Sequence, residues 1–275
     1  MRICVVNNIL HEESEAAAHQ ALLEGCAAGM LRADTAIRIR GLPHAPPTAQ
    51  TAPACYRDPF FQLLSTLQIV RAVVRAEREG FDAAVVNCFD DYGVQEARSL
   101  VDIPVLGIGA TSLGFAAALA APVGLIVPNL PGQVDYATRQ VAAMGLSGAL
   151  LPGGIRHDAL PFAESWQQCL AEPGRAIGRF EPLARALVQE GAASVVFGCG
   201  GFSLVCGAQG FTAVEVAGRA YPVVVPITVT LQRAEEEVLR RREGLPGDPL
   251  LPGAMRHDRA RLARLLSDFG LPPFD

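Results

Sequence analysis

The chain has 275 residues, of which half are apolar and 19% are charged, so it can bury a core as one large domain or two smaller lobes. Its net charge of −5 argues against a nucleic-acid partner, because binding to phosphate backbones needs a concentrated basic face. All 23 basic residues are arginines, which excludes a lysine Schiff base, a phosphate-loop lysine and a catalytic lysine base.

Short apolar segments alternate with longer amphipathic ones in the first part of the chain, as is typical of α/β proteins. The pattern predicts strands at residues 3–6, 35–40 and 83–87, and helices at residues 13–31 and 60–79. Residues 41–59 hold five prolines and predict a long loop that could cover a site. Gly80 is expected to end the helix before it.

The second half of the chain repeats this order of segments. Gly80 precedes Cys88, and Gly191 precedes Cys199, by the same eight residues, and a valine stands three residues before each cysteine. Further matches pair residues 104–106 with 222–224 and, more loosely, residues 5–7 with 126–129. The repeat predicts an α/β fold of two similar lobes related by an approximate two-fold axis. Each lobe would be a mostly parallel sheet flanked by helices, with the active site in the cleft between them.

Two predicted helices connect the lobes. Residues 111–121 would carry the chain into the second lobe, and residues 228–242 would carry it back onto the first. We therefore predict that residues 1–108 together with 228–275 form lobe one, and that residues 109–227 form lobe two.

The C-terminal tail departs from the repeat. From Gly244 the composition shifts to glycine and proline, and a short basic helix is predicted at residues 256–269. The sequence of residues 150–158 is echoed at residues 250–258, and we interpret this echo as either a shared loop-and-cap structure or a diverged insertion, without a functional role assigned to it.

Cys88 and Cys199 each stand where a buried strand is predicted to end and a turn to begin. Ligands of parallel sheets bind beyond the carboxyl ends of the strands, often at a helix N-terminus. Backbone N–H groups there are expected to lower the pKa of a thiol, so that thiolate is available. Each cysteine alone could be a small buried core residue, but their shared register favours a functional pair.

A two-fold axis would bring the two sulfurs to opposite faces of one ligand. That arrangement suits inversion at a carbon next to a carbonyl, because one thiolate can remove a proton from one face while the other thiol returns one to the opposite face. Such a reaction needs no cofactor.

Four other positions are candidates for ligand binding. Gly200 and Gly201 leave backbone N–H groups bare, as an oxyanion site requires. Asn7 ends the first predicted strand and could bind a ligand carbonyl or carboxylate, or simply form a turn. Asn129 is its counterpart in the second lobe.

The remaining polar residues are expected to have structural roles. Asp90 and Asp91 are predicted to cap a helix at residues 92–100. The five histidines show no pairing with either cysteine in the sequence, and we expect them on solvated faces.

The apolar segments give no sign of export or membrane insertion. The run at residues 3–6 is too short for a cleavable signal, and residues 115–125 are too few to span a bilayer. Seven cysteines in such a chain indicate reduced thiols and a cytoplasmic location. No cysteine and histidine spacing of the zinc type occurs, so we expect a small-molecule ligand and no metal.

Three motifs carry a resemblance to a known family. They are Asn87-Cys88-Phe89-Asp90-Asp91-x-Gly93 with the following Ala97-Arg98 and Ile103–Gly109, then Gly198-Cys199-Gly200-Gly201, and Asn7 at the end of the first strand. Together they resemble the hydantoin racemases of the aspartate/glutamate racemase superfamily over roughly residues 1–240. The family's Asn-Pro-Asn start is here Asn7-Asn8-Ile9, and the acidic residue that usually follows its Gly-Ile-Gly strand is replaced by Ala110. The reaction type therefore follows from the resemblance more directly than the substrate does.

The resemblance implies a two-lobed fold, cofactor-independent inversion by two thiols, and a homo-oligomer. It also implies that Phe89 and Asp90 contact the substrate. We predict an isomerase, a racemase or epimerase acting on a hydantoin or allantoin-like ring, with Cys88 and Cys199 as the acid/bases.

Two alternatives stay open. A decarboxylase or a maleate-type cis-trans isomerase of the same superfamily would use its cysteines differently, because decarboxylation needs only one protonating thiol. The chain could also be a protein that binds a small ligand in the cleft but does not catalyse a reaction.

Overall fold

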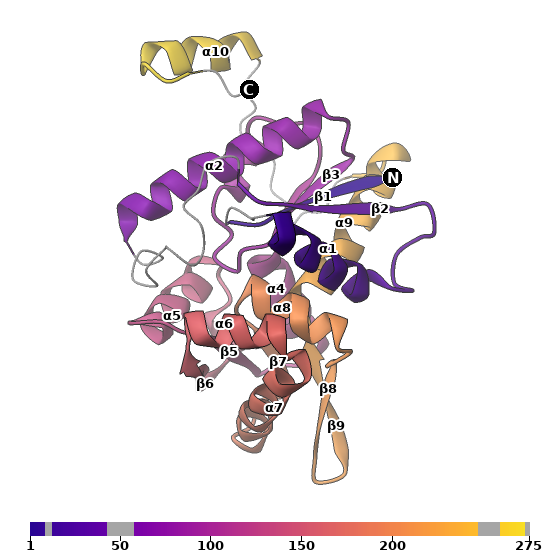
Figure 1. The fold of residues 1–275 in the computed structure, drawn as a ribbon, viewed down its shortest axis with the longest axis vertical. Helices are drawn as coiled ribbons and strands as arrows, with labels where there is room; N and C mark the ends of the chain where they lie inside the picture. Colours follow the sequence, from indigo (N-terminus) through magenta and orange to yellow (C-terminus); the bar gives the residue numbers. More distant parts are fainter. Residues whose placement is uncertain (9–12, 43–57, 247–258, 273–275) are drawn as a thin grey trace.

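The computed structural model describes residues 1–8, 13–42, 58–246 and 259–272 and contains two β-sheets with helices packed around them (Figure 1). The strands of the first sheet are β1 (Arg2–Val6), β2 (Ala36–Arg40), β3 (Ala83–Val86) and β4 (Val105–Gly107). They lie in the order β2-β1-β3-β4, and every pair is parallel.

The second sheet repeats this arrangement. Its strands are β5 (Val123–Asn129), β6 (Leu150–Pro161), β7 (Ser194–Phe197), β8 (Ala213–Val216) and β9 (Arg219–Val224). They lie in the order β6-β5-β7-β9-β8, and only the β8–β9 pair is antiparallel. The order β6-β5-β7-β9 matches β2-β1-β3-β4 strand for strand, which confirms the predicted α/β fold with two similar, mostly parallel sheets.

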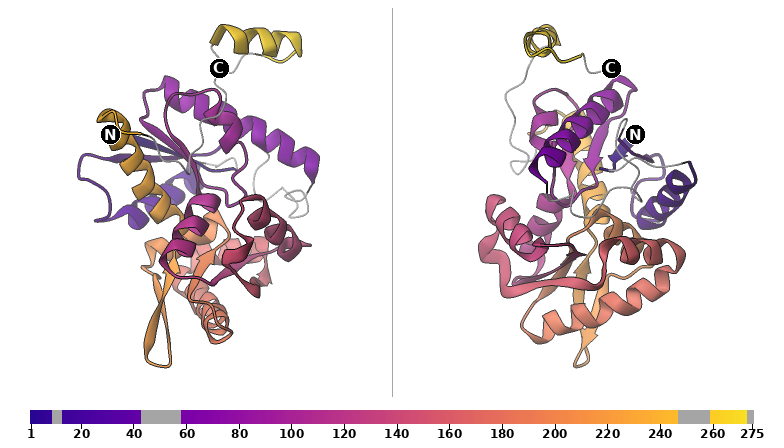
Figure 2. Two further views of the ribbon diagram at one scale, coloured as in Figure 1. Left: turned by 180° about the vertical axis from the view of Figure 1, so that it is seen from behind. Right: turned by 60° about the vertical axis from the view of Figure 1, so that its left-hand side comes forward.

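Helices flank both sheets (Figures 1 and 2). Those described are α1 (Glu13–Ala27), α2 (Pro59–Arg78), α3 (Val94–Arg98), α4 (Ile108–Leu119), α5 (Gln133–Ala143), α6 (Phe162–Ala171), α7 (Pro173–Gln189), α8 (Gly200–Ala208), α9 (Pro226–Arg242) and α10 (Arg259–Asp268). No helix within the described ranges has both the length and the apolar character needed to cross a bilayer.

Local sequence signals fix the helix that leads to each cysteine strand. At the start of α2, the Asp58 side chain accepts a hydrogen bond from the Phe61 N–H at 2.7 Å, and Pro59 occupies the first turn. Gly80, with φ of 79°, follows α2, and Gly191, with φ of 113°, follows α7. Both glycines adopt the left-handed conformation that turns a helix end back toward a strand, so the predicted glycine repeat has a shared physical basis.

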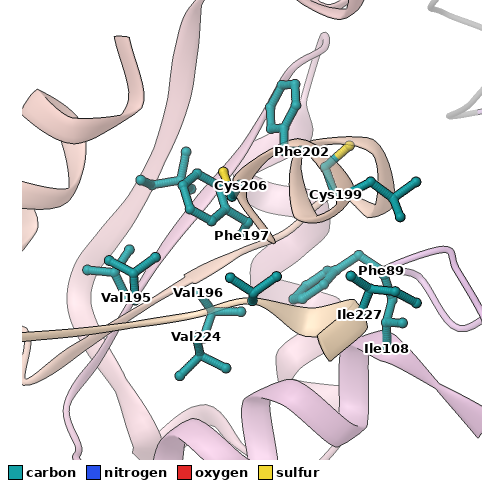
Figure 3. Close-up of a cluster of buried hydrophobic side chains, with 14 of the residues drawn as sticks. Phe89, Ile108, Val195, Val196, Phe197, Cys199, Phe202, Cys206, Val224 and Ile227 are labelled. Carbon is teal, nitrogen blue, oxygen red and sulfur yellow. The ribbon is translucent and has the colours of Figure 1, made fainter. Parts of the chain in front are cut away.

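The central strands are buried on both faces, as parallel strands covered by helices require. In β1, Ile3 and Val5 face a core cluster that continues into the second lobe, whereas Cys4 and Val6 face a separate cluster formed with α2. The inter-lobe cluster gathers Phe197, Phe202 and Val224 of the second lobe with Phe89 and Ile108 of the first (Figure 3). The two lobes therefore share one hydrophobic core.

Two crossing helices interlock the lobes, as predicted. Helix α4 leaves the first sheet and contacts β5 and β7 of the second. Helix α9 leaves the second sheet and contacts β1, β3 and β4 of the first. The proposed boundaries after residues 108 and 227 fall close to the starts of these helices, and they stay a prediction.

Two local predictions are wrong. Residues 150–158 form most of strand β6 rather than a loop and cap, while the echo at 250–258 and the predicted loop at 43–57 lie outside the described residues. The short helix α3 begins after Gly93, whose φ is 72°, and is not capped by an aspartate side chain. Asp91 caps another helix, as described below.

A buried ion pair ties β6 to the helices that follow it. Asp158 is fully buried and accepts hydrogen bonds from the Arg179 Nε and Nη2 atoms at 3.1 Å each, and also from the Ser165 hydroxyl. Arg179 lies on α7 and Ser165 on α6, so the carboxylate joins three elements. Removing one partner of a buried pair leaves the other charge without compensation.

We expect Asp158→Ala to lower the free energy of unfolding by about 3–5 kcal/mol, because Arg179 then loses its carboxylate. Glu236→Ala is the matched control: it breaks the exposed Arg233–Glu236 pair and is expected to cost less than about 1 kcal/mol. Urea denaturation of both variants measures the difference, and equal losses would contradict this role of Asp158.

Candidate active site

Both predicted cysteines line one cavity between the two lobes. The cavity and its open mouth together contain about 690 Å³ of empty space, which includes bulk solvent. Its lining consists of Asn7, Asn8, His19, Asn87, Cys88, Phe89, Asp90, Pro128, Leu130, Gln133, Phe162, Trp166, Gly198, Cys199, Gly200 and Gly201. The structure thus brings together every predicted site residue except Asn129.

The backbones of the two lobes touch beside the two sulfurs. A Cβ atom built on Gly200 would lie 2.4 Å from the carbonyl oxygen of Asn87, so only glycine fits at this position. Asn87 directly precedes Cys88, and Gly200 directly follows Cys199. The contact therefore holds the two cysteine-bearing turns against each other.

Cys199 occupies the N-cap position of α8. The backbone N–H groups of Gly201 and Phe202, at the start of α8, favour the thiolate form of its sulfur. Phe197 before this helix, and Phe202 and Cys206 within it, are packed in the hydrophobic core (Figure 3).

Cys88 has a different environment, because no helix begins directly after it. The backbone N–H of Asp90 favours the thiolate form of its sulfur. The side-chain amide of Asn8 also donates to the sulfur, with an Nδ2–Sγ distance of 3.3 Å. Asn7 and Asn87 lie next to this pair, and the Asn87 amide donates to the Asn7 side-chain oxygen at 2.6 Å.

The expected lowering of the thiol pKa values does not occur. Burial raises the pKa of Cys199 to about 12, and the helix N–H groups offset only part of this increase. Burial also raises the pKa of Cys88 well above its usual range, and the nearby Asp90 carboxylate raises it further. Desolvation outweighs the N-terminal donors because both side chains are buried, with exposed fractions of 7% for Cys88 and 9% for Cys199.

The turn after Cys88 is hydrogen-bonded to the start of α4, the helix that carries the chain into the second lobe. Asp91, with φ of 53°, accepts hydrogen bonds from the N–H groups of Gly109 at 2.9 Å and Ala110 at 2.7 Å. Its carboxylate therefore caps α4 instead of the helix predicted at residues 92–100. Burial raises the pKa of Asp91 to about 7, although these two N–H groups lower it. Gly107 is needed here, because a Cβ on it would lie 2.2 Å from the Asp91 carboxylate.

The same turn also contacts the second lobe. The Tyr92 and Tyr136 hydroxyls are hydrogen-bonded at 2.8 Å, and the Gln140 amide donates to the Asp90 carbonyl at 3.1 Å. Tyr136 and Gln140 lie on α5, whose first residue, Gln133, lines the cavity. This network fixes the Cys88 turn relative to the second lobe.

One wall of the cavity is aromatic and was not predicted. His19 on α1 and Trp166 on α6 come from different lobes, and their ring centroids lie 5.3 Å apart. His19 is only 1% exposed, so the expectation of a solvated histidine is wrong. Trp166 packs on the start of α8, since a Cβ on Gly201 would lie 2.6 Å from its ring. No sequence pattern marks these residues, because they approach the cysteines only through helix packing.

Asn129 lies outside the cavity lining, and its amide donates to the Ala159 carbonyl at 3.5 Å. Strand register explains why it is not the counterpart of Asn7. Val6 of β1 pairs with Val86 of β3, which puts Asn7 beside Asn87, whereas Ile126 of β5 pairs with Phe197 of β7. The equivalent position is therefore residue 127, and Asn129 lies two residues too far along the strand.

The described part of the cavity lining contains amides and apolar side chains but no arginine. The chain has no lysine, and Asp90 is the acidic residue of this lining. Within the described ranges, no group of three or more histidine, cysteine, aspartate or glutamate residues could hold a metal ion.

The family model described as Asp/Glu/Hydantoin racemase matches residues 9–234. The chain belongs to this racemase family. This membership confirms the predicted family and the prediction of an isomerase of the racemase class. The chain is 29% identical to a hydantoin racemase of Paenarthrobacter aurescens over 192 residues, covering 68% of this chain and 74% of that relative.

Solved structures of other proteins share the fold of this chain. An allantoin racemase from Klebsiella pneumoniae matches with a TM-score of 0.66 at 19% identity, covering 94% of each chain. An unliganded arylmalonate decarboxylase matches with a TM-score of 0.51 at 14% identity, covering 91% of this chain and 98% of that one. At these identities, the likeness establishes the two-lobed fold alone.

We expect Gly200→Ala to lower the free energy of unfolding by about 1–3 kcal/mol, because the added methyl group must displace the Asn87 carbonyl. The same displacement should increase the iodoacetamide reactivity of Cys88 and Cys199. Gly178→Ala on α7 is the control, since its Cβ would meet nothing within 4 Å. Identical behaviour of the two variants in denaturation and alkylation would show that the lobes do not meet tightly at Gly200.

The raised pKa of Cys199 predicts the pH dependence of its alkylation. Below a pKa of about 12, the thiolate fraction grows tenfold with each pH unit, so the rate should rise continuously from pH 7 to pH 10. An exposed thiol with an ordinary pKa would instead level off above about pH 9. Mass spectrometry of the Cys199 peptide after timed iodoacetamide treatment distinguishes the two profiles.

Proposed function

We propose that this protein is a cofactor-independent racemase that inverts a carbon next to a carbonyl in a neutral cyclic amide of the hydantoin or allantoin type. Cys88 and Cys199 would be its two acid/bases. The observation that carries this proposal is that the two cysteines follow equivalent strands, β3 and β7, and line the same cavity from different lobes.

In the proposed reaction, one sulfur acts as thiolate and the other as thiol. The thiolate takes the proton from the stereogenic carbon, and the electron pair of that C–H bond delocalises onto the adjacent carbonyl oxygen. The opposite thiol then gives its proton to the other face of the carbon. Product of inverted configuration leaves, and the two sulfurs have exchanged protonation states.

The polar groups of the cavity suit a neutral ring. A hydantoin offers carbonyl acceptors and N–H donors, and the amides of Asn7, Asn8 and Gln133 provide both kinds of partner. The carboxylate of a free amino acid or a malonate would face Asp90 with no arginine in the described lining to pair with it. Burying such a charge unpaired is costly, so the cavity favours the ring over the acids.

The aromatic wall suits the substituent on the ring. Phe162, Trp166 and Leu130 give this side of the cavity an apolar surface, and Trp166 lies directly over the start of α8. An apolar substituent packed there would hold the stereogenic carbon next to the Cys199 sulfur. Orientation of this kind is a large part of enzymatic rate enhancement.

Deuterium incorporation from heavy water tests the proposal. Wild-type protein is incubated with single enantiomers of substituted hydantoins, allantoin, amino acids and arylmalonates, and proton NMR and chiral chromatography follow exchange and inversion. We expect inversion of a hydantoin-type ring, with deuterium in the product. Cys88→Ser and Cys199→Ser should each lose inversion by at least about 100-fold, because each removes one acid/base.

Cys206→Ser is the matched control, because Cys206 is buried on α8 but does not line the cavity. It should keep the wild-type rate. Inversion that survives either active-site substitution would rule out the two-thiol scheme. Release of carbon dioxide from an arylmalonate would favour the decarboxylase. If a ligand quenches the fluorescence of Trp166, the single tryptophan, but incorporates no deuterium and is not inverted, a binding protein is favoured.

A homo-oligomer and a cytoplasmic location stay predictions. Light scattering of the purified protein tests the first of them.

A further inference from the structure

The two sulfurs receive different hydrogen bonds although they occupy equivalent positions. Cys199 is the N-cap residue of α8, a helix of nine residues, and the backbone N–H groups of Gly201 and Phe202 at the start of this helix favour its thiolate. Cys88 is followed by a turn, and α3 begins only at Val94. The N–H of Asp90 is the one backbone donor among the interactions described at its sulfur. The first lobe therefore lacks the helix N-terminus that serves the second.

Strand register places Asn8 where it can make up this difference. Val6 pairs with Val86, so Asn8 lies beside Cys88, two residues further along the same pair of strands. The printed contact agrees, with the Asn8 amide nitrogen 3.3 Å from the Cys88 sulfur. In the second lobe Ile126 pairs with Phe197, so the residue beside Cys199 is Pro128, which has no side-chain donor. The amide occurs only next to the cysteine that lacks a helix.

We propose that Asn8 is a positioning residue of the reaction, whose amide holds the Cys88 sulfur and stabilises its thiolate in place of a helix N-terminus. This inference rests on the proposed function for its role in catalysis, but the contact with the sulfur is independent of it. Hydrogen bonds to an ionised acceptor are stronger than those to a neutral one, so the amide favours the thiolate over the thiol.

The surroundings of Cys88 make such a donor necessary. The groups that act on its sulfur are the carboxylates of Asp90 and Asp91 on its own turn and Cys199 across the cavity, and all three disfavour a second negative charge. Tyr92 lies nearby and is hydrogen-bonded to Tyr136 and Asp90. Asn8 is the side-chain donor described at this sulfur, which distinguishes it from the groups that oppose ionisation.

Competitive alkylation within one protein tests the proposal without any substrate. Wild type, Asn8→Leu and Asn8→Asp are treated with iodoacetamide at pH 8.5, and mass spectrometry gives the rates for the Cys88 and Cys199 peptides from the same sample. We expect Asn8→Leu to slow Cys88 about tenfold relative to Cys199, because one hydrogen bond to the thiolate is lost. Asn8→Asp should slow it at least as much, since a carboxylate would face the thiolate.

Asn129→Leu is the matched control, because this asparagine lies at a strand end, as Asn8 lies just beyond one, but is outside the cavity lining; the ratio of the two rates should not change. A Cys88 rate in Asn8→Leu within about twofold of wild type, or above it, would overturn the proposal. A similar fall at both cysteines would overturn it too, because that result indicates general disruption.

The racemisation assay separates this inference from the proposed function. In Asn8→Leu, kcat/KM should fall by the same factor for both enantiomers, because the equilibrium constant of a racemisation is one. The pH profile of kcat/KM should shift to higher pH. If Cys88→Ser keeps full inversion while Asn8→Leu still slows alkylation of Cys88, the two-thiol function fails and the sulfur contact stands. If Cys88→Ser abolishes inversion and Asn8→Leu changes neither alkylation nor the pH profile, the role of Asn8 fails alone.

Discussion

The site depends on one close backbone contact, between the carbonyl of Asn87 and the α-carbon of Gly200. It joins the two lobes at the residues next to both cysteines, and it leaves no room for a side chain at Gly200. The shared hydrophobic core and the crossing helices α4 and α9 hold the lobes in this relation. Because packed cores resist small displacements, the positions of the two sulfurs follow from the packing of the whole chain.

A duplicated scaffold supplies the two sulfurs with equivalent positions but different surroundings. A cysteine stands two residues after the end of the third strand of each sheet, β3 and β7. After Cys199 a helix begins, whereas after Cys88 the chain turns so that Asp91 can cap α4. Because this turn caps α4, no helix begins directly after Cys88 as one does after Cys199. Hydrogen bonds to the Cys88 sulfur therefore come from side chains such as that of Asn8.

The cavity combines strong desolvation with few charges. Burial raises the pKa of both thiols. The same burial strengthens each hydrogen bond in the site, because little water competes for it. A neutral ring loses less hydration free energy on entering such a cavity than a carboxylate does. The same desolvation therefore favours the proposed substrate class and raises the thiol pKa values.

The sequence alone determined the fold class, the strands that precede the two cysteines and the pairing of Cys88 with Cys199, because these depend on local periodicity and on a spacing that both halves repeat. It also placed Asn7, Phe89 and Asp90 next to Cys88, since they adjoin strand ends. Tertiary structure decided the rest. Strand register excluded Asn129, helix packing brought His19 and Trp166 to the cavity, and burial reversed the expected direction of the thiol pKa shifts. Register, packing and desolvation arise between segments far apart in the chain, so no local pattern of residues encodes them.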